Sequence, residues 1–237
     1  MKKIQKGTVK NIEKVSIDVF KIEIKSSVKN ANAGQFISIL CPPVTLRRPF
    51  SICGFDNGTI TVLFKEKGEG TKYIKSLKIG DEVDFLGPLG NGFKIENKKA
   101  LLVGAGIGIA PMLFLSDELK KKNIENYLVC GFKAKEEIIA GADEVTIGGS
   151  VLDNLQELIN FHKPEILYSC GPHIVLENVA KIAQKNNLKS QVAMEKVMAC
   201  SIGVCRGCVI QIKKDGEIQN ATICHDGPVF EGDEPVW

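Results

Sequence analysis

The spacing of four cysteines near the carboxyl end constrains this 237-residue chain more than any other feature. The segment "MACSIGVCRGC" places Cys200, Cys205 and Cys208 in one loop, and Cys224 follows after fifteen intervening residues. This is the plant-type ligand spacing for a [2Fe-2S] cluster, in which each iron takes two thiolates. The sequence therefore predicts that these four cysteines converge on a di-iron centre.

A structural zinc site is the alternative, because zinc is also held by four cysteines. Zinc ribbons and fingers usually present two short cysteine pairs, whereas here three cysteines share a loop and the fourth stands alone. Gly203 and Gly207 further favour the cluster, since residues without a Cβ let the main chain approach the sulfur atoms and donate hydrogen bonds to them. His225, beside Cys224, is interpreted as a surface histidine, because four thiolates already complete the set.

Composition narrows the class of protein. With 44% hydrophobic residues and a net charge of only +3, the chain is expected to be globular, and its lysines form no basic stripe of the kind that binds nucleic acid. The amino terminus has no apolar stretch that would make a secretory signal. The longest apolar run, Ala100 to Leu115, is shorter than the roughly 20 residues that span a bilayer. We expect a cytoplasmic protein, in which grouped cysteines bind metal rather than form disulfides.

The chain falls into three regions. From Gly7 to about Phe93, short Val-, Ile- and Phe-rich segments alternate with turns, which predicts an antiparallel barrel with a hairpin around "DNG" at Asp56. From Lys98, buried strands alternate with helices, including one expected to begin at Val151 and one at Pro172, which predicts a parallel α/β sheet. The cysteines and a hairpin around "KKDGE" follow. The predicted domains are residues 1–96, 97–196 and 197–237.

Three further motifs suggest nucleotide cofactors. "VGAGIGIAPM" sets Gly104, Gly106 and Gly108 between a strand and a helix, where free N–H groups favour a phosphate, although glycines there also allow a helix to pack closely. "RRPFSI" offers an arginine for a pyrophosphate, an aromatic face and a small hydroxyl. In "KGEGT", Gly68, Gly70 and Thr71 are expected to form a flexible loop ahead of a short helical segment, which again suits an anion.

The order of these motifs, together with "CGP" at Cys170, resembles the ferredoxin–NADP reductase superfamily. The appended cysteine loop is similar to that of the electron-transfer subunits of type B dihydroorotate dehydrogenases, and the resemblance covers essentially the full length. It implies a flavin-binding β-barrel, a nucleotide-binding α/β domain and a small [2Fe-2S] domain. It also implies three cofactors, namely FAD, the cluster and NAD.

The resemblance also implies a role for individual residues. The FAD diphosphate and isoalloxazine would be held by Arg48, Pro49, Phe50 and Ser51, the backbone of Leu63, Phe64 and Lys65, and Gly70 with Thr71. The nicotinamide nucleotide would be held by Gly104, Gly106 and Gly108, with Cys170 and Gly171 near its ring. No general acid or catalytic triad is expected, because flavin converts a two-electron hydride into single electrons.

The implied partner is an FMN-containing catalytic subunit that oxidises dihydroorotate, in a heterotetramer. Two departures from the family pattern stand out. Ser201 replaces the glycine that commonly follows the first cluster cysteine, and its hydroxyl can alter a hydrogen bond to sulfur. "GADEVTIGGS" replaces an Asp-Asp-Gly loop, which leaves both NAD and NADP open.

Two rival functions share much of this pattern. One is the small flavin subunit of an NADH-dependent ferredoxin–NADP oxidoreductase or of a sulfide dehydrogenase, which has nearly the same domain plan. The other is a nucleotide-binding module that is stabilised by a structural zinc site and has no redox function.

Overall fold

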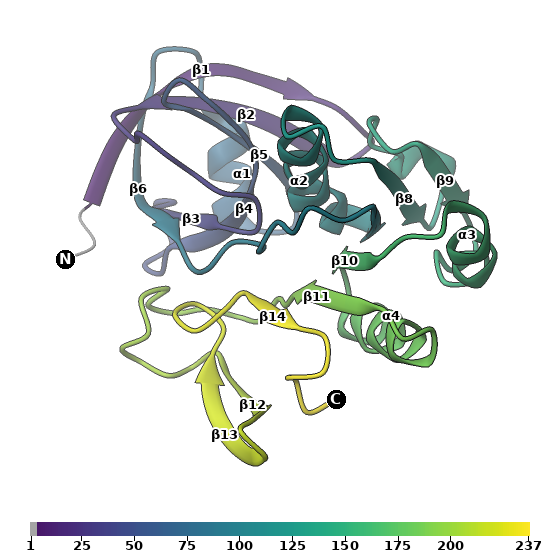
Figure 1. Cartoon of the computed structure of the whole chain (residues 1–237). Coiled ribbons are helices and arrows are strands. Elements are labelled where there is room, and N and C mark those ends of the chain that lie inside the picture. Colours follow the sequence, from purple (N-terminus) through teal and green to yellow (C-terminus); the bar gives the residue numbers. More distant parts are fainter. Residues whose placement is uncertain (1–3) are drawn as a thin grey trace.

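The computed structural model describes residues 4–237, which form a closed antiparallel barrel, a six-stranded sheet and a two-stranded sheet (Figure 1). The predicted combination of a barrel with a parallel-sheet domain is therefore confirmed. No helix within the described residues is long and apolar enough to cross a membrane.

The barrel has the strand order β1-β2-β5-β4-β3-β6. Alternate residues of its strands face the interior, so that Ile22 and Ile24 are fully buried while the intervening Glu23 is not. The elements are β1 (Ile4–Lys14), β2 (Val19–Ser26), β3 (Phe36–Ile39), β4 (Arg48–Asp56), β5 (Thr59–Lys65), α1 (Glu69–Ser76) and β6 (Glu82–Leu89).

The β4–β5 hairpin turns at Asn57 and Gly58, which have φ angles of 44° and 80°. Positive φ at both central residues is the geometry of a type I′ turn, which Asn-Gly favours and which matches the twist of the flanking strands. This confirms the hairpin predicted from "DNG". The β4–β5 register runs from Asp56↔Thr59 to Ile52↔Val62 and stops there, several residues before either strand ends.

The α/β domain is a sheet of order β14-β11-β10-β7-β8-β9, in which every pairing except that of β14 is parallel. Its elements are β7 (Ala100–Ala105), the 3-10 turn η1 (Gly106–Gly108), α2 (Ile109–Lys121), β8 (Asn126–Phe132), η2 (Lys135–Glu137), β9 (Glu144–Ile147), α3 (Leu155–His162), β10 (Ile166–Cys170), α4 (His173–Lys185) and β11 (Lys189–Ala193).

Two helix starts differ from the prediction. α3 begins at Leu155 and not at Val151, because the preceding residues form a turn in which the Asp153 carboxylate accepts the Ser150 N–H at 2.8 Å. α4 begins at His173, with Pro172 in extended conformation as the N-cap rather than inside the first turn.

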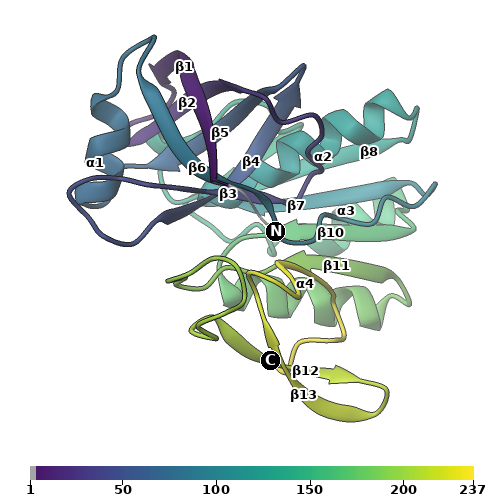
Figure 2. The ribbon, with the colours of Figure 1, turned by 90° about the vertical axis from the view of Figure 1, so that its left-hand side faces the viewer.

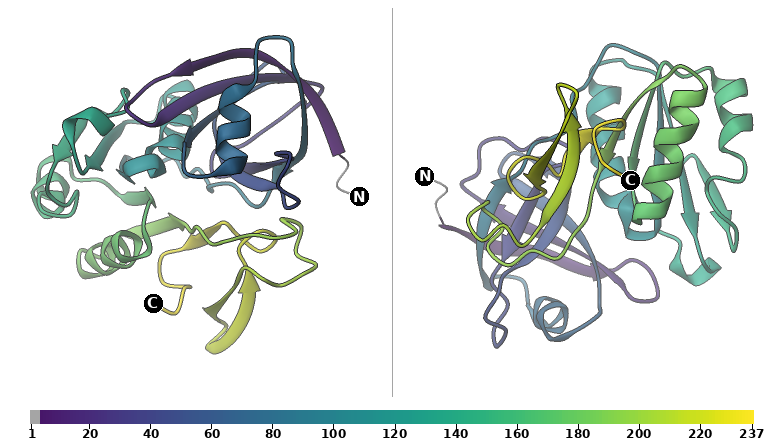
Figure 3. Two further views of the ribbon diagram at one scale, coloured as in Figure 1. Left: turned by 180° about the vertical axis from the view of Figure 1, so that it is seen from behind. Right: turned by 90° about the horizontal axis from the view of Figure 1, so that it is seen from below.

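The carboxyl-terminal segment contributes β12 (Val209–Lys214) and β13 (Glu217–Thr222), joined by a turn at Asp215 and Gly216, which confirms the "KKDGE" hairpin. Its last strand, β14 (Val229–Glu231), pairs antiparallel with β11 and so completes the sheet of the α/β domain. The segment lies next to both other parts of the chain (Figures 2 and 3). The boundaries at 96/97 and 196/197 stay predictions.

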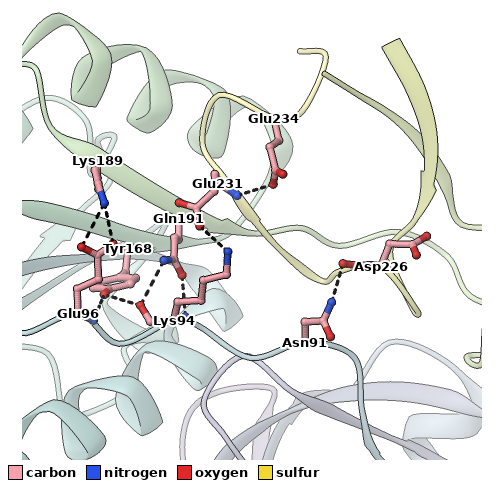
Figure 4. Close-up of polar contacts among 9 residues, drawn as sticks. All are labelled: Asn91, Lys94, Glu96, Tyr168, Lys189, Gln191, Asp226, Glu231 and Glu234. Atoms are coloured by element: carbon pink, nitrogen blue, oxygen red, sulfur yellow. Dashed lines mark hydrogen bonds and ion pairs between the residues drawn. The ribbon is translucent and has the colours of Figure 1, made fainter. Parts of the chain in front are cut away.

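A hydrogen-bond network holds the linker after the barrel against the other two parts (Figure 4). The buried amide of Gln191 accepts the Lys94 N–H at 2.9 Å and donates to the Lys94 carbonyl at 3.2 Å, and the Tyr168 hydroxyl donates to the same carbonyl. Asn91 donates to the Asp226 carbonyl at 2.8 Å. Since paired buried polar groups favour one arrangement, this network fixes the barrel relative to the sheet and the carboxyl-terminal segment.

Candidate functional site

The predicted flavin motif forms the first half of β4. There the strand pairs only with β3, from Ile39↔Arg48 to Phe36↔Ser51. Because the β4–β5 ladder ends at Ile52↔Val62, the segments Arg48–Ser51 and Leu63–Lys65 separate from one another. Their facing backbone edges are left without ladder partners, and such edges suit the polar rim of a ring system.

The two adjacent arginines of "RRPFSI" have different surroundings. Arg47 forms an ion pair with Asp84 at 2.6 Å. Arg48 has no ion pair within the described residues, and its side-chain stem lies against Gly70, where an added Cβ would be 3.1 Å from Arg48 Cγ. Arg48 is thus placed at the amino terminus of α1, whose first N–H groups have no intrahelical partner. The Arg48 Nη1 donates to the Leu46 carbonyl at 2.9 Å, which orients the guanidinium without neutralising its charge. An arginine without an ion pair beside a helix amino terminus fits a diphosphate.

The Thr71 hydroxyl is already used inside this loop. It accepts the N–H groups of Lys67 and Gly68 at 2.9 and 3.0 Å and donates to the Gly68 carbonyl at 2.8 Å. The Thr71 side chain therefore shapes the glycine-rich loop. A contact between Thr71 and the flavin phosphates stays a prediction, and the backbone N–H groups of this turn would make it. Phe50 is half-buried and packs edge-on against Phe64 with ring centroids 6.0 Å apart.

The structure brings the glycine loop and the Cys170–Gly171 segment into contact. A Cβ on Gly108 would lie 2.3 Å from the Cys170 carbonyl oxygen, and one on Gly171 would lie 2.8 Å from Ala105 Cβ. Gly106, in contrast, has φ of +55° and would meet nothing within 4 Å. Gly108 is therefore required for close packing, whereas Gly106 serves the turn and faces open space.

The flavin and nucleotide motifs adjoin one another. Helix α2 packs against β4, and the glycine turn η1 contacts β5.

Burial raises the pKa of the Cys170 thiol to about 12, with the nearby Glu195 carboxylate adding to the effect, so this thiol stays neutral and protonated at physiological pH.

We expect Gly108→Ala to weaken NADH binding, because the added methyl group cannot fit against the Cys170 carbonyl without moving the loop. Overpacking of this kind typically costs about 1–3 kcal/mol of folding free energy. Calorimetric titration with NADH, alongside flavin and iron analysis, measures the effect. The matched control is Gly54→Ala, whose methyl group would meet only Thr61 at an ordinary 3.6 Å. Unchanged NADH affinity in Gly108→Ala would contradict the assignment.

The four predicted cluster cysteines lie in two pairs. Cys205 donates its N–H to the Cys200 sulfur at 3.3 Å, and Cys224 donates its N–H to the Cys208 sulfur at 3.4 Å. Across residues 4–237, no three potential ligands converge tightly enough to hold a single metal ion. Two pairs of thiols match a di-iron cluster, in which each iron takes two of them.

Backbone N–H groups of the loop point at these sulfurs, as the glycine positions predicted. Gly203 donates to the Cys224 sulfur at 3.1 Å, and Gly207 donates to the Cys205 sulfur at 3.4 Å. Burial acts to raise the pKa of the Cys200 thiol, but N–H donors from Cys205, Ile202 and Val204 outweigh it and lower that pKa to about 6. The loop therefore stabilises the Cys200 thiolate, which is the form that ligates iron, whereas burial and the neighbouring Cys208 raise the pKa of the Cys224 thiol to about 12. The N–H donors to the sulfurs fit a cluster.

The cluster loop packs on the same strand that borders the flavin motif. Phe36 of β3 and Leu89 of β6 share a hydrophobic core with Met198, Cys208 and other residues of the carboxyl-terminal segment. Phe36 pairs with Ser51 on its other side. β3 thus lies between the flavin motif and the cysteine loop.

Of the cysteines outside the cluster set and Cys170, Cys41 and Cys130 are fully buried, and Cys53 is half-buried. The sequence did not reveal the side-chain role of Lys65. The ammonium of this residue pairs with Asp18 at 2.8 Å and with Glu137 at 3.0 Å, and so ties β5 to the α/β domain. No local signal in the sequence identifies these partners.

Two family models match the chain. Residues 6–93 match an oxidoreductase FAD-binding domain, and residues 195–235 match the iron-sulfur cluster binding domain of dihydroorotate dehydrogenase B. A solved structure of an NADH-dependent reduced ferredoxin-NADP oxidoreductase superposes with a TM-score of 0.84 at 28% identity, covering 98% of this chain and 90% of that one. A flavohaem-like FAD/NAD-binding domain of a nitric oxide dioxygenase from Vibrio cholerae shares the fold, with a TM-score of 0.66 at 20% identity, covering 78% of this chain and 94% of that one.

Relatives described as the electron transfer subunit of dihydroorotate dehydrogenase B (NAD(+)) align over most of their length. The protein from Caldanaerobacter subterraneus is 35% identical, with 98% of each chain covered. That from Streptococcus mutans is 33% identical over 94% of this chain and 95% of the relative. Since these identities extend over nearly the whole chain, the protein belongs to the family of dihydroorotate dehydrogenase B electron transfer subunits.

Proposed function

We propose that this chain is the electron-transfer subunit of an NAD-dependent dihydroorotate dehydrogenase and serves pyrimidine biosynthesis. It relays electrons from a catalytic subunit through a [2Fe-2S] cluster and FAD to NAD. The observation that carries the proposal is the position of β3, which has the cysteine loop packed on it and pairs directly with the flavin motif. A chain that holds both groups this close can pass charge between them.

Bound FAD supplies the conversion between a two-electron hydride and single electrons. In this proposal the Arg48 guanidinium and the first N–H groups of α1, at Gly70 and Thr71, hold the diphosphate. The ring would lie along the first half of β4 and the end of β5, where the two strands form no ladder. The residues that would hold it are Pro49, Phe50 and Ser51, with the backbone of Leu63, Phe64 and Lys65.

The nicotinamide nucleotide is proposed to bind along the glycine turn at Gly104, Gly106 and Gly108, with its ring near Cys170 and Gly171. Support comes from the contact between these two segments and from the contact of η1 with β5. Because the Cys170 thiol is neutral, it would contact the nicotinamide ring as an uncharged polar group and would limit the space beside it. Because a hydride moves between rings without a protein base, the residues bind and orient.

The partner is proposed to be an FMN-containing catalytic subunit, assembled with this chain as a heterotetramer. The eight cysteines form no disulfide within residues 4–237, which agrees with the proposal of a reducing compartment such as the cytoplasm.

Co-purification with the catalytic subunit tests the function. We expect the complex to reduce NAD with dihydroorotate, whereas this chain alone oxidises NADH with artificial acceptors and leaves dihydroorotate untouched. Native mass spectrometry of the complex reports its stoichiometry. Dihydroorotate oxidation by the isolated chain would refute the proposal.

The flavin subunit of an NADH-dependent ferredoxin–NADP oxidoreductase is a second candidate, favoured by the high structural similarity to such an enzyme. The two functions need different partners. NADPH-dependent reduction of ferredoxin by a complex containing this chain, without any activity on dihydroorotate, would support the second candidate instead.

A further inference from the structure

A pair of buried serines joins the cysteine loop to the barrel. Ser38 of β3 and Ser201 of the loop are 0% and 1% exposed, and their hydroxyl oxygens are 2.8 Å apart. The residues are separated by 163 positions in the sequence. We infer that this hydrogen bond positions the cluster loop on the flavin barrel and thereby orients a donor to the Cys200 sulfur. The inference rests on the proposed role of Cys200 as a cluster ligand.

Ser201 directly follows Cys200 and has φ of +61°. Residues other than glycine adopt positive φ angles rarely and at an energetic cost, because the Cβ approaches the backbone. If only the turn mattered, a glycine would form it without that cost. The hydroxyl is therefore the feature that a serine adds here, and it bonds to Ser38 rather than to a sulfur.

Ser38 is a rigid anchor for this contact. It lies in β3 between two neighbouring strands, opposite Pro49 of the flavin motif and Leu86 of β6. Its carbonyl accepts the Arg47 guanidinium at 3.4 Å, and Arg47 is itself fixed by the ion pair with Asp84. The serine pair thus connects the loop to the strand that pairs with the flavin motif.

The contact acts on the cluster ligand through the loop that both belong to. Cys200 directly precedes Ser201, and its sulfur accepts the Cys205 N–H of the same loop at 3.3 Å. Fixing the Ser201 side chain therefore holds this loop, and with it the Cys205 donor, in one orientation. Because hydrogen bonds to ligand sulfurs help set the reduction potential of an iron–sulfur cluster, Ser38 and Ser201 are positioning residues for the electron relay.

The test uses the full chain with FAD and cluster bound, as wild type, Ser38→Ala, Ser201→Ala and the double variant. Removing one hydroxyl leaves the other buried and unpaired, which should accelerate hydrogen exchange of the loop amides at residues 199–206 by roughly 5- to 150-fold. The cluster potential, measured by titration with paramagnetic-resonance detection, should become more negative as the Cys205 donor to the Cys200 sulfur is displaced. The two single effects should not add, because they remove the same bond.

Ser169→Ala is the matched control, since Ser169 is equally buried, lies on β10 and has no hydrogen-bond partner for its hydroxyl among residues 4–237. It should leave both the loop exchange and the potential unchanged. Ser38→Thr keeps a hydroxyl and should preserve the potential, and Ser201→Gly replaces Ser201→Ala if the latter binds no iron.

Three outcomes separate the ideas under test. A wild-type chain that holds no cluster overturns the proposed function and the inference together. A wild-type chain with its cluster, but with an unchanged potential and unchanged loop exchange in both single variants, overturns the inference alone. Additive effects of the two substitutions also overturn it.

Discussion

Replacing Cys205 with serine is expected to abolish the iron–sulfur centre while leaving flavin in place. Cys205 is exposed, so the change disturbs little packing, but it removes one of the two thiolates of its pair. Loss of a residue that only hydrogen-bonds a metal ligand typically lowers metal affinity or activity about 10–100-fold. Loss of a ligand itself should therefore lower electron delivery to the partner by more than about 100-fold. Iron analysis and partner-linked NADH oxidation measure this.

Cys53→Ser is the control for this variant, because Cys53 is a half-buried thiol in β4 away from the cysteine loop. It should retain full iron. NADH oxidation with a flavin-directed acceptor should survive in Cys205→Ser, since the flavin motif lies on the other side of β3. Wild-type iron content in Cys205→Ser would show that Cys205 is not a ligand.

Replacing Arg48 with leucine is expected to weaken FAD binding about 10- to 150-fold, the range for losing hydrogen bonds to a charged group. Arg48 has no ion pair within residues 4–237 and lies against Gly70 at the start of α1, so its charge is available to a diphosphate. Titration of the flavin-free protein with FAD gives the dissociation constant.

Lys72→Leu provides a comparison on the same helix. Lys72 forms an exposed ion pair with Glu69 at 2.9 Å, and such pairs contribute little. FAD affinity should change less than about fivefold in this variant. If Arg48→Leu bound FAD as tightly as the wild-type chain, the diphosphate site would have to lie elsewhere.

Much of the fold could be predicted because its signals are local. The Asn-Gly turn at residues 57 and 58, the run of short strands and the alternation of strands with helices all follow from neighbouring residues. The cysteine spacing is also local for three of the four ligands. These features depend on backbone conformations that a few adjacent residues determine.

The contacts that build the site could not be predicted in this way. The pairing of β14 with β11, the packing of Gly108 on the Cys170 carbonyl and the Ser38–Ser201 bond join residues far apart in the sequence. Nothing in "FISIL" distinguishes Ser38 from any other strand serine. The start of α3 was missed because the Ser150–Asp153 turn competes with the helix.

In the proposed function, this chain holds a di-iron cluster and a flavin close enough to exchange electrons. Anaerobic purification of the whole chain, with iron, sulfide and flavin analysis followed by titration with NADH, measures whether it does. We expect two irons for each flavin, and bleaching of the flavin band accompanied by the paramagnetic signal of a reduced cluster. A colourless protein with one zinc, or an iron signal that NADH never reaches, would contradict it.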